Sequence, residues 1–189
     1  MARKSLYPIS NIFLNRWSSR ALSNEPVINE QLMKLFEAAR WAPSSYNEQP
    51  WRFIYTRKGT PTWDSLLGLM LPINQIWAKN APVFVVLISK TFFDRNTKPS
   101  HTHTFDAGAA WMSLALQGSI DGLVIHAIAD FDYEKAQAFL NLPPEFKIEI
   151  IIAIGNPGNK EALPAELQIR EKPSDRKSLK EIVFEDAFK

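Results

Sequence analysis

The sequence predicts a single domain of the α/β or α+β class. Its 189 residues suit one domain, or one domain with arms. Its 46% of hydrophobic and 12% of aromatic residues are enough to bury a core. Helix-like and strand-like segments alternate along the chain. We therefore expect one domain over residues 1–189, with irregular arms at about 1–26 and 156–189 that wrap around a second subunit.

In the first half, the elements follow from spacing and from helix signals. Apolar residues recur at helical spacing from Ile28 to Ala39, Asn29 is a plausible cap, and Pro43 disfavours helical geometry at the residue before it. Thr60-Pro61 is a favourable helix start. Runs rich in aromatic and β-branched residues indicate strands. The predicted elements are a helix from 28 that stops before 43, a strand over 51–57, helices from 60 and over 73–79, and a buried strand over 83–89.

In the second half, residues 90–104 show no period and are predicted to be a loop. A long helix rich in small residues follows over 105–122, where Gly122 suits its C-terminal turn. Asp132 is expected to cap a short helix. The remaining predicted elements are an extended piece over 123–128, a largely buried strand over 147–155, and a polar tail that ends in an amphipathic segment over 178–188.

Composition excludes several classes of function. The net charge of +2 gives no argument for nucleic-acid binding. The chain has no cysteine, which excludes disulfides, thiolate metal sites and cysteine nucleophiles. No apolar run is long enough for a signal peptide or a membrane span. We expect a cytoplasmic protein that binds neither nucleic acid nor membrane.

The three histidines give no strong metal signal. His101 and His103 have a spacing that can chelate a metal, but no carboxylate or third histidine lies at a useful distance in the sequence. Two exposed loop histidines are therefore the favoured interpretation, and we predict no metal site. His126 lies on an apolar, strand-like piece, which favours a buried or cavity-lining role. The chain also lacks GxGxxG, GK[ST] and G-x-S-x-G motifs in the contexts that would give them meaning.

The stretch "APSSYNEQPWRF" (42–53) places two prolines around several hydrogen-bonding side chains. Amides such as those of Asn47 and Gln49 can recognise a heterocycle that presents both donors and acceptors. The prolines limit the freedom of the loop and so reduce the entropy lost on binding. A stiff helix-to-strand turn whose side chains only cap backbone groups explains the stretch about equally well.

Basic residues gather near both ends of the chain. Arg16, Ser18 and Arg20 alternate, so in an extended arm they face one side, an arrangement that suits a phosphate. The run "REKPSDRK" (170–177) supplies Arg176 and Lys177. Taken alone, the 16–20 cluster is equally typical of a solvated charged arm, and the 170–177 run is more typical of an exposed run of charges. Together with the amide loop, they suit a ligand with an anionic tail and a hydrogen-bonding ring.

Four segments, in order, resemble the nitroreductase family of FMN-dependent oxidoreductases. They are the R-x-S-x-R element at 16–20, the "APSSYNEQPW" loop, the helix "FDAGAAWMSLALQGSIDGL" with "HAIADFD" after it, and the pair "IAIGNPG" and "PSDRKSLKEIVF" near the end. The resemblance implies an α+β sandwich: a central, mostly antiparallel sheet flanked by helices, with arms wrapping the partner of a homodimer. It implies two FMN sites at the subunit interface.

The resemblance also implies residue roles. Arg16, Ser18, Arg176 and Lys177 would contact the FMN phosphate or ribityl chain, and Arg20 would lie near the pyrimidine edge of the ring. In the family the Ser-Ser-x-Asn contacts come from the partner subunit. One departure is Asp130, which stands where many members carry glycine, so the local turn can differ. The full implied cofactor-binding set is Arg16, Trp17, Ser18, Arg20, Pro43, Ser44, Ser45, Asn47, Gln49, Ala127, Ile128, Ala129 (its N–H toward flavin N5), Arg176 and Lys177.

The implied activity is a ping-pong transfer of hydride from NAD(P)H, by way of flavin N5, to a nitroaromatic, a quinone or a similar small acceptor. No side-chain acid or base is required, so no catalytic side chain is assigned. The loop 90–104, with Phe92, Phe93 and both of its histidines, is a candidate lid, and Trp63, Trp77 and Trp111 are either pocket or core residues. Two alternatives remain: another reaction on the same fold, such as dehydrogenation, dehalogenation or flavin breakdown, and flavin binding without turnover.

Overall fold

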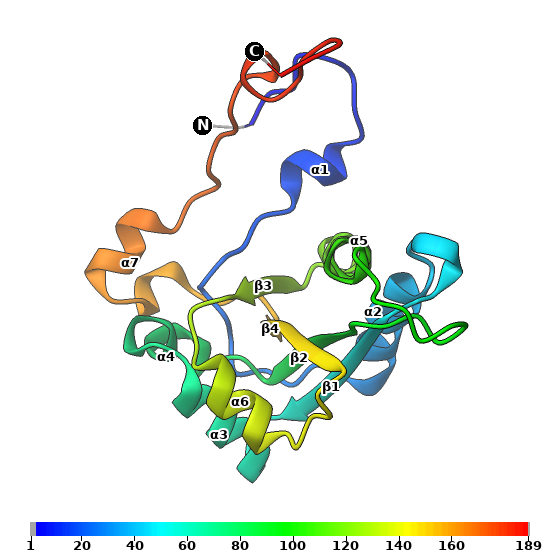
Figure 1. The fold of residues 1–189 in the computed structure, drawn as a ribbon. Helices are drawn as coiled ribbons and strands as arrows, with labels where there is room; N and C mark the ends of the chain where they lie inside the picture. The colour runs from blue at the N-terminus through cyan, green and yellow to red at the C-terminus, as the bar shows by residue number, and fades with distance from the viewer. Residues whose placement is uncertain (1–2, 189) are drawn as a thin grey trace.

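The computed structural model describes residues 3–188, which build a four-stranded sheet with helices against both faces (Figure 1). The strand order is β1-β2-β4-β3, and each neighbouring pair is antiparallel. The strands are β1 (Trp51–Arg57), β2 (Val83–Lys90), β3 (Val124–Ile128) and β4 (Phe146–Gly155). The α+β class with an antiparallel sheet is therefore confirmed.

Local signals placed most helices correctly. The side chains of Thr60 and Asp132 cap their helices, and Gly122 follows the longest helix with a positive φ of 75°. Asn29 was wrongly expected to be a cap: it is the first helical residue, and Ile28 precedes it. The helices are α1 (Asn11–Asn15), α2 (Asn29–Arg40), α3 (Pro61–Leu69), α4 (Pro72–Ala78), α5 (His103–Ile120), α6 (Tyr133–Phe139) and α7 (Ala165–Arg170), with single 3-10 turns at Ser45–Asn47, Lys160–Ala162 and Leu179–Glu181.

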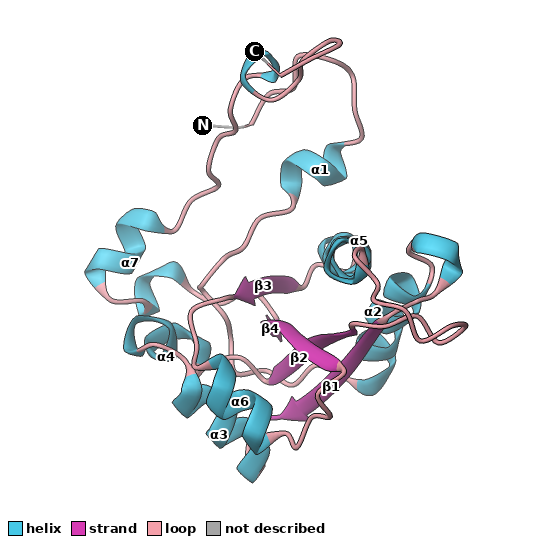
Figure 2. Cartoon of the chain, in the orientation of Figure 1, coloured by secondary structure: helices cyan, strands magenta, loops and turns pink. Residues whose placement is uncertain are grey.

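The sheet separates two hydrophobic cores (Figure 2). Helices α2 and α5 cover one face, and α3, α4 and α6 cover the other. Along β2, Val83, Val85 and Leu87 face α5, whereas the residues between them face α3 and α4. Because this central strand is buried on both faces, it is apolar at nearly every position, as its sequence indicated.

A β-bulge interrupts the pairing of β2 with β4. Leu87 pairs with Ile150, but the next residue, Ile88, pairs with Ile148, so Glu149 is an extra residue in β4. A bulge turns one side chain out of the regular alternation and bends its strand. Here it turns a carboxylate toward the α5 face of the sheet, where that carboxylate contacts the first turn of the helix.

The described parts of the two arms, which end at residues 3 and 188, extend beyond α1 into the same region (Figure 1). Closer to the sheet the arms are tied to each other: Gly158 N–H donates to the Ala21 carbonyl (2.8 Å) and Ser23 N–H to that of Asn156 (3.0 Å). A Cβ on Gly158 would lie 2.4 Å from the carbonyl carbon of Leu22, so only glycine permits this close approach. Over residues 3–188, no helix combines the length and apolar character that crossing a membrane requires.

Candidate functional site

One cavity of about 300 Å³ is lined by the alternating residues of the N-terminal arm that the sequence singled out, Arg16, Ser18 and Arg20. The chain's other end contributes further cations, so residues more than 150 positions apart meet here. The remaining lining residues are Arg3, Trp17, His126, Arg170, Lys172, Ser174 and Arg176. We call this the arginine cavity.

The arginine cavity concentrates positive charge. Burial lowers the pKa of Arg16 from its usual value, and the neighbouring Arg176 and Arg3 guanidinium groups lower it further. Among the residues that the structure describes, no carboxylate oxygen lies within 4 Å of the Arg16, Arg20 or Arg176 guanidinium nitrogens. Cations that repel one another and have no acidic partner form a favourable site for an anion.

His126 lines the cavity and adds no charge to it at neutral pH. Its ring lies 4.4 Å from that of Trp77, and its Nδ1 is 2.8 Å from the carbonyl oxygen of Ser19. Since a carbonyl only accepts, Nδ1 carries the proton. Burial is the main reason why the pKa of His126 is lowered to about 4, with a smaller contribution from the Arg20 charge. The sequence-based expectation of a buried or lining histidine is confirmed.

The loop 43–49 holds an uncommon backbone. Tyr46, Asn47 and Gln49 have φ values of 54°, 56° and 50°, in the left-handed region that residues other than glycine seldom adopt. Internal hydrogen bonds hold this path: the N–H of Gln49 donates to Ser44 Oγ, and Gln49 Nε2 donates to the Asn47 carbonyl, both at 2.9 Å. Gln49 therefore braces the loop. Strain of this kind, held by its surroundings, is typical of ligand-binding segments.

Asp106 attaches the loop to helix α5. The Ser45 N–H donates to Asp106 Oδ2 at 3.2 Å, and Thr102 Oγ1 donates to the same oxygen at 3.2 Å. Asp106 is only 3% exposed and lies in the first turn of α5, where the helix dipole favours a negative charge. The N-terminus of α5 thus fixes the position of the two serines that precede Tyr46.

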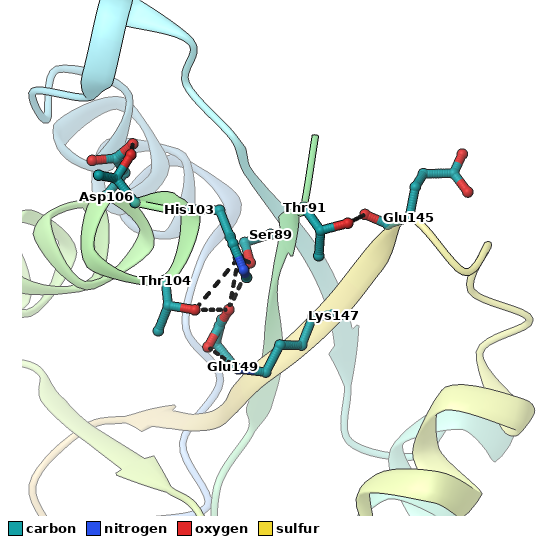
Figure 3. A network of polar contacts seen from close by, with 9 residues as sticks. Ser89, Thr91, His103, Thr104, Asp106, Glu145, Lys147 and Glu149 are labelled. Atoms are coloured by element: carbon teal, nitrogen blue, oxygen red, sulfur yellow. Dashed lines mark hydrogen bonds and ion pairs between the residues drawn. The ribbon is translucent and has the colours of Figure 1, made fainter. Parts of the chain in front are cut away.

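A polar network fixes that N-terminus to the sheet (Figure 3). Ser89 Oγ donates to Glu149 Oε1 at 2.6 Å, and Thr104 Oγ1 donates to the same oxygen at 3.0 Å. His103 Nδ1 lies 2.7 Å from Ser89 Oγ, and its side chain is 16% exposed. The prediction of two exposed loop histidines is therefore wrong for His103: α5 starts at His103, two residues before the predicted start, which turns its ring onto β2. His101 is exposed.

The predicted lid packs against the loop 43–49. The Arg95 guanidinium lies 3.6 Å from the centre of the Tyr46 ring, and the Phe93 ring meets the same tyrosine edge-on. The Asp94 N–H donates to the Glu48 carboxylate, a contact that the sequence did not suggest. Trp63 and Trp77 are buried in the core, and Trp111 is half-buried.

The turn after β3 is exposed at Ala129 and Asp130. The Asp130 carbonyl accepts the Leu71 N–H at 3.1 Å, which ties the turn to the segment before α4. Asp130 does not have a positive φ, so its backbone has a conformation that any residue adopts. The absence of glycine at this position therefore creates no strain in the turn.

Comparisons with family models and with solved structures identify relatives of this chain. The model of the nitroreductase family matches residues 14–62, from the arm through the loop 43–49 to the start of α3. A crystal structure described as an oxidoreductase containing FMN is 42% identical, with a TM-score of 0.94 over 99% of this chain and 96% of that one. The chain belongs to the nitroreductase family.

Two more distant matches also carry nitroreductase descriptions. A Desulfovibrio desulfuricans protein, provisionally described as a nitroreductase and solved in complex with FMN, is 24% identical, with a TM-score of 0.77 over 98% of this chain and 100% of that one. A Polynucleobacter asymbioticus protein with the provisional name NADH dehydrogenase/NAD(P)H nitroreductase is 24% identical over 82% of this chain and 88% of its own length.

In this nitroreductase chain the candidate residues form two separate groups. The arginine cavity lies between the arm, β3 and α7, whereas the loop 43–49 lies at the opposite side of the molecule, beside the N-terminus of α5 (Figure 1). His126 on β3 lines the cavity, whereas Ala127, Ile128 and Ala129 follow it in the chain and are not among the lining residues. Arg176 lies in the cavity, but Lys177 is exposed and outside its lining.

Sequence reasoning missed several residues of the site. Arg170 and Lys172 were visible in the "REKPSDRK" run, but only its last two cations were assigned to the ligand. Asp106 and Glu171 carry no local signal, because each acts on a backbone segment 61 or about 150 positions away.

Proposed function

We propose that this chain is an FMN-dependent oxidoreductase that transfers hydride from NAD(P)H, by way of flavin N5, to a nitroaromatic, quinone or similar small acceptor in a ping-pong reaction. The arginine cavity carries the proposal. Its guanidinium groups are suited to a phosphate dianion, because planar donors can bind two phosphate oxygens at once and Arg16, Arg20 and Arg176 have no acidic partner among the described residues. The FMN found in two related structures supports the same ligand.

Bound FMN supplies the hydride chemistry, and this chain supplies position and charge. Arg16, Ser18 and Arg176 would hold the phosphate and ribityl chain, with Lys177 at the rim. Arg20, in the same cavity, would place a positive charge at the pyrimidine edge of the ring. Such a preorganised charge is worth a few kcal/mol, on the order of a single lost oxyanion donor. The backbone of 127–129 would pack against the ring.

The remaining contacts would come from a second subunit. In one chain Pro43, Ser44, Ser45 and Asn47 lie far from the arginine cavity. A flavin held in the cavity can meet this loop only if the loop belongs to a partner. We therefore propose a homodimer with two sites, each formed by the arginine cavity of one subunit and the loop 43–49 of the other.

Exposed apolar side chains support the dimer. Phe105 and Ile120 on α5 are 80% and 65% exposed, and the two terminal segments expose more. Exposed apolar residues of this number commonly mark a contact surface. The terminal segments contribute Leu6, Tyr7, Leu179, Ile182, Val183, Phe184 and Phe188.

The test is the absorbance spectrum of the purified protein. We expect a flavin spectrum that NADH or NADPH bleaches without air and that a nitroaromatic or quinone restores. Protein that takes up no added FMN would refute the proposal. Flavin that stays oxidised with both nicotinamides while another substrate turns over would show a different reaction on this fold. Bound flavin with no turnover on an acceptor panel would show a binding protein.

A further inference from the structure

Glu171 holds the N-terminal arm at the position where the arm enters the arginine cavity. Its Oε1 accepts three hydrogen bonds: from Ser19 Oγ at 2.5 Å, from the Arg20 N–H at 2.9 Å and from the Ala21 N–H at 3.0 Å. Glu171 is 6% exposed and directly follows α7. A buried carboxylate that accepts several donors holds them firmly, because separating any of them leaves a buried charge poorly solvated.

His126 holds the same segment from the opposite direction. Its Nδ1–H donates to the Ser19 carbonyl, so Ser19 is fixed through its side chain by Glu171 and through its backbone by β3. Ser19 itself is buried. We call Glu171, His126 and Ser19 the arm latch.

The latch decides which way the neighbouring side chains face. In extended chain, successive side chains point to opposite sides. With Ser19 turned inward onto Glu171, its two neighbours Ser18 and Arg20 line the arginine cavity, and so do Arg16 and Trp17 just before them in the arm. Nearer the chain terminus, the arm from Asn11 to Asn15 buries no side chain, so local packing alone does not fix this direction.

We propose that Glu171 and His126 are positioning residues that aim Arg16 and Ser18 at the FMN phosphate and keep Arg20, the proposed charge at the pyrimidine edge, in the same cavity. This inference rests on the function proposed above. Both ends of the chain then build the same phosphate site. Arg170 contributes a cation to the cavity, and the next residue, Glu171, holds the arm that supplies the others.

The sign of the effect separates positioning from simple electrostatics. Glu171 is an anion near a phosphate site, so removing its charge would by itself strengthen phosphate binding. Losing the latch would weaken it, because the arm would no longer present its cations together. Glu171→Ala removes both the negative charge and the hydrogen bonds to the arm. Glu171→Gln removes the charge but keeps an oxygen that can accept hydrogen bonds from the three donors.

The experiment compares FMN with riboflavin, which has the same ring and no phosphate, by fluorescence titration of the apoprotein. For Glu171→Ala we expect FMN affinity to fall about tenfold while riboflavin affinity changes less than about twofold. Glu171→Gln should stay within about threefold of wild type for both ligands. Glu166→Ala, which removes an exposed carboxylate from the same helix α7, is the matched control and should change neither affinity.

The outcomes are distinguishable. Wild-type protein that binds no FMN overturns both the function and this inference. Wild-type protein that binds FMN, with Glu171→Ala binding it equally or more tightly, overturns the latch alone; so does an equal loss for FMN and riboflavin, which indicates general destabilisation. If Glu171→Ala does not fold, Ser19→Ala is the deciding variant. We expect its affinity for FMN to fall about threefold and its affinity for riboflavin to stay the same. A ratio of FMN affinity to riboflavin affinity that equals the wild-type ratio overturns the inference.

Discussion

At the scale of single residues, three buried ionisable side chains, His126, Asp106 and Glu171, each form a hydrogen bond with the backbone of a segment far away in the sequence. His126 is buried between Trp77 and the arm and stays neutral, because burial disfavours its charged form. Asp106 and Glu171 are also buried, and both accept backbone N–H groups of segments that the proposed site uses. The buried polar residues thus set the positions of loops whose own sequences do not fix them.

The neutral state of His126 predicts a pH dependence of stability. Its pKa is about 4 in the folded chain and about 6.5 when unfolded, so below pH 6.5 the unfolded state binds the extra proton. The free energy of unfolding should therefore fall as the pH drops from about 6.5 to about 4, by up to about 3 kcal/mol from this residue. Urea unfolding at pH 7.5, 6.0 and 5.0 measures it.

His126→Asn is the control, because its amide can donate to Ser19 and does not titrate in this range. The difference in the free energy of unfolding between wild type and His126→Asn should shrink or reverse as the pH falls. A difference that stays constant between pH 7.5 and 5.0 would contradict a neutral, buried His126.

Asp106 predicts an effect on the loop 43–49. Asp106→Ala removes the acceptor of the Ser45 N–H, which should cost about 2 kcal/mol of stability and lower FMN affinity at the same time. Asp106→Asn keeps one acceptor oxygen, so its stability and its FMN affinity should lie between those of wild type and those of Asp106→Ala. Thermal unfolding and FMN titration measure both effects; full FMN affinity in Asp106→Ala would show that the loop does not contribute to the site.

At the scale of elements, most helices and strands were predictable, because apolar spacing and capping are local properties. The strands at 51–57 and 83–89 and the caps at Thr60 and Asp132 agree with their signals. Helices α1 and α7 were missed, because each is too short to show helical periodicity. The bulge at Glu149 was also missed, because it depends on the register with β2, which no single strand contains.

The bulge gives an element-scale prediction. Glu149→Ala removes the acceptor that Ser89 and Thr104 share, and it should lower the free energy of unfolding by about 2 kcal/mol. Lys147→Ala on the same strand breaks only the long, 3.8 Å ion pair between the exposed Lys147 side chain and Glu149, and it should cost less than about 0.5 kcal/mol. Urea denaturation of both variants compares them, and equal costs would mean that the network in Figure 3 does not hold α5 to the sheet.

At the scale of the whole molecule, the two groups of candidate residues lie on opposite sides of one chain, and the apolar side chains of the arms lack a core of their own. Both features are explained if each site forms between two copies. The Phe184 and Phe188 rings, 4.7 Å apart near the C-terminus, are exposed in the single chain and would be covered in such a dimer.

Replacing both phenylalanines with serine should therefore weaken the dimer and make FMN binding depend on protein concentration. Light scattering and FMN titration over a hundredfold range of concentration measure this. Glu185→Ala, in the same segment, should leave both unchanged. If the double variant remains a dimer with wild-type FMN affinity, the C-terminal arm does not contribute to the dimer interface.

By itself, the sequence determined the fold class, most of the elements and the residue types of the proposed site, since apolar spacing, helix caps and short motifs each depend on only a few neighbouring positions. The tertiary structure decided which of those residues meet. Only folding places Glu171 against Ser19, 152 positions away, and turns Arg16, Ser18 and Arg20 into the cavity that Arg170 and Arg176 complete. The physical reason is that a buried carboxylate requires donors, and the chain supplies them from the arm that the proposed function needs held in place.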